Sequence, residues 1–145
     1  MTYNSRYEEY VDLILRQIVF DLRNTDIFPN ENVTYGFYKQ WEEDEYPNAI
    51  VRFRSDNVTL ATREEEGHTF RFEVLATIQG TGNPEEDQDM QIDVMGQIYD
   101  AIRNDNTLGD HANWALIRSV DVTFRRDRSY IFFEFLIVIE VFRVW

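Results

Sequence analysis

The last sixteen residues of the chain, Tyr130 to Trp145, constrain the fold most, because the strand that they predict is apolar on both faces. Side chains of a strand alternate between its two faces. One face holds Ile131, Phe133, Phe135, Ile137, Ile139, Val141, Arg143 and Trp145. The other holds Phe132, Glu134, Leu136, Val138, Glu140, Phe142 and Val144. Such a strand needs cover on both faces, either within its own fold as a central strand or from a neighbouring subunit. The sequence leaves both alternatives open.

The second face of this strand, together with two arginines, forms a candidate subunit interface. The segment 49–54 alternates apolar residues with Arg52 and Arg54, which indicates a half-buried strand. Arginine and aromatic residues are enriched where proteins contact one another. The candidate interface residues are Phe132, Leu136, Val138, Phe142, Arg52 and Arg54.

The rest of the chain predicts an α+β fold. Ser5 and Glu8 form a capping box ahead of an amphipathic helix, and Asn83 with Pro84 marks the start of a second helix. The two helices are expected to pack on one face of a mostly antiparallel sheet. The expected elements, in the order helix, strands, hairpin, helix and hairpin, cover 7–22, 33–38, 49–54, 58–62 with 70–78, 84–103, and 116–124 with 130–145.

Composition excludes several classes of function. With 145 residues, the chain is expected to form a single domain over 1–145. It contains no cysteine, which excludes disulfides and thiolate chemistry. There are 27 acidic and 14 basic residues, giving a net charge of −13, which argues against tight binding of nucleic acid. No signal peptide and no stretch of about 20 apolar residues is evident, so we expect a protein made in the cytoplasm with no membrane contact.

A search for chemistry finds no constellation of the kind that enzymes use. Glu134 and Glu140 stand among apolar residues and are either catalytic carboxylates or ion-pair partners. Pairing is favoured, and the candidate partners are Arg52, Arg54, Arg71 and Arg118. His68 and His111 show no metal-ligand spacing and are expected to be solvated. We expect no cofactor, no metal and no enzymatic activity.

In size and order of elements, the chain resembles the tail terminator, or tail-completion, proteins of long-tailed bacteriophages and the related head–tail joining proteins of the neck. The features that carry the resemblance are the N-terminal helix Tyr7 to Leu22, the long hairpin ending in Ile78, the helix Pro84 to Arg103 and the closing hairpin ending at Trp145. The resemblance implies a structural virion protein, made in the host cytoplasm. It would form a hexameric ring that caps the tail tube and joins it to the head connector.

The same resemblance implies that DNA passes through the ring without specific binding. Candidate acids facing the lumen are Glu64, Glu65, Glu66, Glu85, Glu86 and Asp87. The partners would be other copies of the chain, the tail tube protein and the head–tail connector proteins. Two alternatives stay open: a small acidic ligand-binding module or enzyme that uses buried Glu134 or Glu140, and another structural component of the tail or baseplate.

Overall fold

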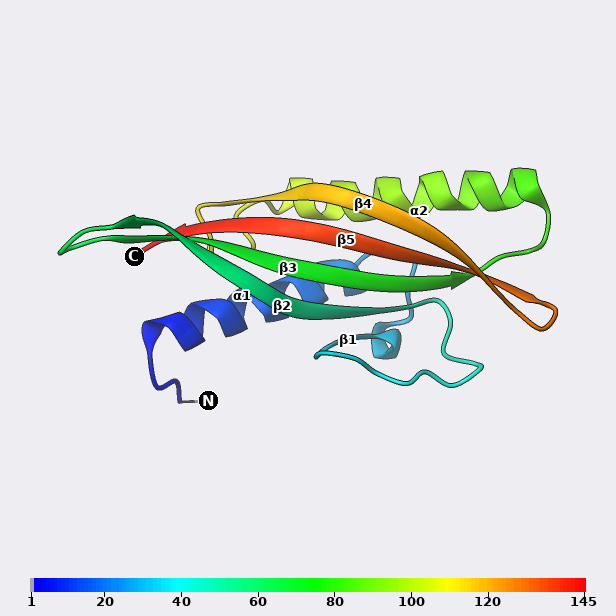
Figure 1. Cartoon of the computed structure of the whole chain (residues 1–145), viewed down its shortest axis with the longest axis horizontal. Coiled ribbons are helices and arrows are strands. Elements are labelled where there is room, and N and C mark those ends of the chain that lie inside the picture. The colour runs from blue at the N-terminus through cyan, green and yellow to red at the C-terminus, as the bar shows by residue number, and fades with distance from the viewer. Residues whose placement is uncertain (1) are drawn as a thin grey trace.

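A computed structural model describes residues 2–145, except for the side chain of Leu60. It contains two α-helices and a five-stranded sheet in the order β1-β2-β3-β5-β4 (Figure 1). Only the short β1 pairs in parallel, with β2, and the other neighbours are antiparallel. The α+β class with a mostly antiparallel sheet is therefore confirmed. The elements are α1 (Arg6–Arg23), η1 (Asn30–Asn32), β1 (Val33–Tyr35), β2 (Asn48–Ala61), β3 (Glu66–Gln79), α2 (Pro84–Asn104), β4 (Trp114–Asp127) and β5 (Tyr130–Val144).

Both helices pack on the same face of the sheet and lie behind it in the view of Figure 1. The Ser5 hydroxyl accepts the N–H of Glu8 at the start of α1, and the Asn83 side chain accepts two N–H groups at the start of α2. Each helix buries one stripe at helical spacing against the sheet. The stripes are Ile14, Ile18 and Leu22 in α1, and Val94, Ile98 and Ile102 in α2.

The strand β5 lies inside the sheet, between β3 and β4. Its face toward the helices is buried, and Phe135, Ile137 and Ile139 are each at most 1% exposed. Full burial of one such side chain stabilises a fold by about 1.5–3 kcal/mol. The expectation of a central strand covered within its own fold thus holds for this face.

The segment 36–47 differs from the sequence prediction. A strand was expected over 33–38, but β1 ends at Tyr35, and Phe37 and Tyr38 are exposed. The segment then crosses to the face of the sheet opposite the helices. Gly36 lies next to Ile50 there, and the Tyr46 ring lies 5.0 Å from the Phe132 ring. One end of that face is therefore covered by the chain itself.

A carboxyl pair joins the two helices near their C-terminal ends. The Gln17 side chain of α1 donates to Asp21 and to Asp105, the residue that caps α2, at 3.1 Å each. Burial, followed by the hydrogen bond to Asp105, raises the pKa of Asp21 from 3.8 to about 8. Burial also acts to raise the pKa of Asp105, but hydrogen bonds from Asp21, Gly109 and Gln17 outweigh it and lower that pKa. Asp21 is therefore the partner that holds the proton.

This assignment predicts how stability changes with pH. Between pH 3.8 and about 8, Asp21 is protonated in the folded protein and ionised in the unfolded chain. Its stabilising contribution is therefore complete below pH 3.8 and is lost as the pH rises through about 8. We expect Asp21→Asn to remove this loss and to be more stable than the wild type at pH 8, with the advantage shrinking toward pH 4. Thermal unfolding across that range measures the difference, with the exposed Asp26→Asn as control. A difference that does not change with pH would contradict the assignment.

Candidate subunit interface

The face of the sheet opposite the helices, here called the open face, carries an apolar stripe. The stripe is defined by Leu75, Leu116, Leu136, Val138, Phe142 and Trp114. Cross-strand pairing brings its members together, because Leu75 lies opposite Leu136, and Phe142 lies opposite Trp114. The rings of Phe142 and Trp114 stack with their centroids 5.4 Å apart. No stripe residue belongs to the core beneath the helices.

The six residues expected at a subunit interface lie in different surroundings. Leu136, Val138 and Phe142 belong to the stripe and are partly exposed. Phe132 is only 8% exposed, because Tyr46 covers it and the Arg125 guanidinium lies 4.6 Å from the centre of its ring. Phe132 is therefore covered by its own chain. Arg54 is exposed at a β-bulge of β2, and Arg52 is partly buried on the open face.

Ion pairs lie beside the stripe, and the carboxylate of one of them, Glu140, interrupts it between Val138 and Phe142 on β5. The Arg52 guanidinium contacts the Glu73 carboxylate at 2.7 Å, and both side chains are largely buried. Glu140 lies between Arg71 and Arg118, at 3.3 and 3.9 Å. Glu134 accepts a 2.7 Å hydrogen bond from Arg125. Each of these three carboxylates is thus paired with at least one arginine.

These contacts confirm that Glu134 and Glu140 pair with arginines on neighbouring strands. Arg71 and Arg118 were expected partners, whereas Arg125 was not among them. The position of the β4–β5 turn would have identified Arg125 as the partner of Glu134. Asp127 pairs with Tyr130, so Thr123 lies opposite Glu134, and Arg125 is its diagonal neighbour. A two-residue turn at Arg128 and Ser129 would have given this register.

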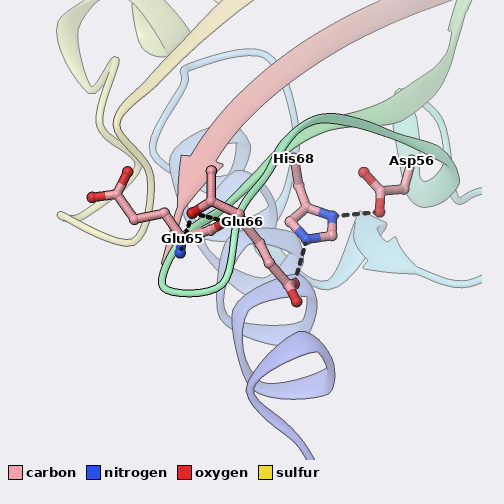
Figure 2. A network of polar contacts seen from close by, with 5 residues as sticks. Asp56, Glu65, Glu66 and His68 are labelled. Carbon is pink, nitrogen blue, oxygen red and sulfur yellow. Dashed lines mark hydrogen bonds and ion pairs between the residues drawn. The ribbon is translucent and has the colours of Figure 1, made fainter.

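The expectation of a solvated His68 is wrong. The side chain lies on the helix-facing side of β3, the residue is 5% exposed, and each ring nitrogen contacts a carboxylate (Figure 2). His111 lies in the loop before β4 and is partly exposed. Across the described part of the chain, no three His, Cys, Asp or Glu residues are grouped so that they could hold a metal ion.

The six candidate lumen acids fall into two groups at opposite ends of the long axis (Figure 1). Glu64, Glu65 and Glu66 are exposed at the β2–β3 turn, and Glu85 and Glu86 are exposed at the start of α2. The expectation that Asp87 faces a lumen does not fit the structure, because Asp87 is only 5% exposed. Its carboxylate accepts N–H groups from Thr81 and Gly82. These hydrogen bonds, that of the Thr81 N–H foremost, lower the pKa of Asp87.

A cavity of about 480 Å³ lies between the segment 41–46 and the β4–β5 turn. Trp41, Tyr46, Arg125, Arg128 and Tyr130 are among the residues that line it. Its lining also includes the carboxylates of Glu43, Asp44 and Asp127, and it contains no histidine. The described residues include no helix long and apolar enough to cross a membrane.

Comparison with known proteins adds little to this description. No protein-family model matches the chain, and no curated protein does. Among solved structures, the chain is similar to one from the "Virion of native gene transfer agent (GTA) particle", at 10% sequence identity and a TM-score of 0.34. The match covers 86% of this chain and 90% of the other.

Burial predicts how much each ion pair of the open face contributes to stability. The Glu73 and Arg52 side chains are 11% and 23% exposed, whereas those of Glu134 and Arg125 are 45% and 43% exposed. Glu73→Gln leaves a buried guanidinium without its carboxylate, and we expect it to cost about 1.5–3 kcal/mol. Glu134→Gln should cost at most about 1 kcal/mol. Urea unfolding of both variants measures the two costs, and equal costs would contradict the ranking.

Proposed function

We propose that this protein is a structural subunit of a phage-like virion and that it assembles with copies of itself through the open face. The observation that carries the proposal is the apolar stripe, which neither a helix nor the segment 36–47 covers. The aromatic pair at one end of the stripe, Phe142 and Trp114, is the kind of group that dominates binding energy when buried between subunits.

The charges of the open face support this role. Each chain carries a net charge of −13, so two copies repel one another in general. Next to the apolar stripe, however, four arginines lie close to four carboxylates. They are Arg52, Arg71, Arg118 and Arg125, against Glu73, Glu134, Glu140 and Asp121. The charges next to the stripe therefore balance one another, whereas further acids of the same face, Glu43, Asp44 and Asp127, lie near Phe132. Copies can thus approach at the stripe with less opposing charge than elsewhere.

The finer proposal follows the resemblance to tail terminators. The subunit would form a hexameric ring that caps the tail tube and joins it to the head connector in the neck of the virion. Six copies would carry roughly six times −13, about −80, and such a field repels the phosphates of passing DNA. The exposed acids at the β2–β3 turn and at the start of α2 would contribute to it.

This role requires neither a cofactor nor a metal ion. It also differs from the alternative in which Glu134 or Glu140 performs acid–base chemistry. The Glu134 side chain is 45% exposed and paired with Arg125, and Glu140 is held by two arginines, so a ligand would have to displace these contacts. The paired carboxylates therefore favour a structural role for both residues.

Phe142→Ser tests the proposal, because it removes one ring of the aromatic pair in the stripe. We expect the wild type to form closed rings, alone or beside tail-tube protein, and the variant to remain a folded monomer. Phe20→Ser is the matched control, since Phe20 is exposed on α1, away from the open face. Native mass spectrometry and sedimentation velocity measure assembly, and circular dichroism checks the fold.

Two results would overturn the proposal. One is a wild type that stays monomeric at high concentration and also in the presence of tail-tube protein. The other is a pair of variants, Phe142→Ser and Phe20→Ser, that form rings equally well. The first result rejects self-assembly itself, whereas the second rejects only the open face as its surface.

A further inference from the structure

Three parts of the chain that are distant in sequence meet at the His68 ring. The ring comes from β3 and stacks on the C-terminal residue Trp145, with centroids 4.1 Å apart and planes 2° from parallel. The edge of the Tyr7 ring, at the start of α1, lies 5.7 Å away. The side chain is therefore placed where a change in its charge affects the β2–β3 hairpin, the C-terminus and the first turn of α1 together.

Both ring nitrogens of His68 face carboxylates (Figure 2). Nδ1 lies 2.6 Å from Oδ2 of Asp56 on β2, and Nε2 lies 3.1 Å from Oε2 of Glu66 on β3. An ionised carboxylate only accepts hydrogen bonds, and a neutral imidazole has a single N–H. Only the imidazolium ion can donate to both carboxylates. The neutral ring leaves one nitrogen lone pair pointing at a carboxylate oxygen.

The two carboxylate contacts are unequal. Asp56 is the more buried partner and has the shorter contact, with a side chain 13% exposed against 54% for Glu66. When the ring loses a proton, the contact to the exposed Glu66 is the one that water can replace at lower cost. Deprotonation should therefore release Glu66 first and leave the hydrogen bond to Asp56.

Release of Glu66 affects the C-terminus directly. The Glu66 backbone N–H donates to the Trp145 carbonyl at 2.7 Å, and the Trp145 N–H donates to the Glu66 carbonyl at 2.9 Å. The Trp145 indole also covers the face of the His68 ring, where an imidazolium is attracted to the aromatic π-system. The protonated ring thus holds both residues of this backbone pair, Glu66 through its carboxylate and Trp145 through its indole. Both contacts weaken when the ring is neutral.

The other charged and titratable groups around the ring do not replace the imidazolium. Burial and the negative charge of Asp56 raise the pKa of Tyr7, which keeps its hydroxyl neutral. On β5, the Arg143 guanidinium lies 4.3 Å from the centre of the Tyr10 ring of α1. Arg143 is the cross-strand neighbour of His68, but no ion pair joins it to Asp56 or Glu66 among the described residues, so His68 is the group that contacts both carboxylates.

We propose that His68 is a pH-dependent latch. In its protonated form it fastens the base of the β2–β3 turn to Trp145, and in its neutral form it releases them. The turn carries the exposed Glu64 and Glu65, so the latch controls how firmly these acids are held. The proposal does not depend on assembly of the protein, because every group that it uses belongs to one chain.

Amide hydrogen exchange across about pH 5 to 8, the range in which histidine changes charge, tests the latch. After correction for intrinsic exchange, protection of the Glu66 and Trp145 amides should fall about tenfold as His68 loses its proton, since one charge-assisted hydrogen bond is lost. Amides paired between β3 and β5, such as Ile139, should keep constant protection. A ¹⁵N titration of the His68 ring should follow the same curve.

The chain offers a matched control, because it has only one other histidine. His68→Gln should abolish the pH dependence at Glu66 and Trp145, and His111→Gln should keep it. Glu66→Gln, which changes an exposed side chain, provides a second variant if His68→Gln does not fold, and it too should flatten the profile of Trp145. Protection that is independent of pH in the wild type would overturn the latch. The latch would also be overturned if His68→Gln or Glu66→Gln folds and its amide protection still depends on pH as in the wild type.

Discussion

The position of β5 between β3 and β4 is the constraint on which the rest of the structure depends. Its helix-facing residues Phe135, Ile137 and Ile139 lie at the centre of the core, and both helices pack against the sheet there. Because strand side chains alternate, a slip of one residue would move this apolar set to the other face. The core therefore fixes the register. The register in turn places Leu136, Val138 and Phe142 together on the open face, so the candidate interface is a consequence of the core.

Local patterns were sufficient to predict most of the elements. The capping residues Ser5 and Asn83 and the spacing of apolar residues located both helices, and alternation located the strands. The surroundings of His68 and Asp87 could not be predicted, because their partners come from elsewhere in the fold or from a specific turn. Trp145, which covers His68, is distant in sequence. The cover that the segment 36–47 gives to Phe132 likewise depends on tertiary structure, since nothing in its sequence indicates which way it turns.

Several buried polar groups in this protein lie where elements are joined, and the centre of the core is apolar. Asp87 holds the turn at Thr81 and Gly82 onto the first turn of α2. The pair Asp21 and Asp105 joins the C-terminal end of α1 to the cap of α2. Such contacts require defined partners and geometry, unlike apolar contacts. They therefore fix how the elements connect, while burial of apolar area supplies most of the stability.

The distribution of charge explains why the open face is suited to contact between copies even though the chain is strongly acidic. Exposed acids are placed at both ends of the long axis, at the β2–β3 turn and at the start of α2 (Figure 1). The apolar stripe lies between these ends, and the arginines beside it pair with the carboxylates next to it. Repulsion between like-charged copies is therefore weakest where apolar area is available for burial. This distribution favours the open face as the surface for the proposed self-association.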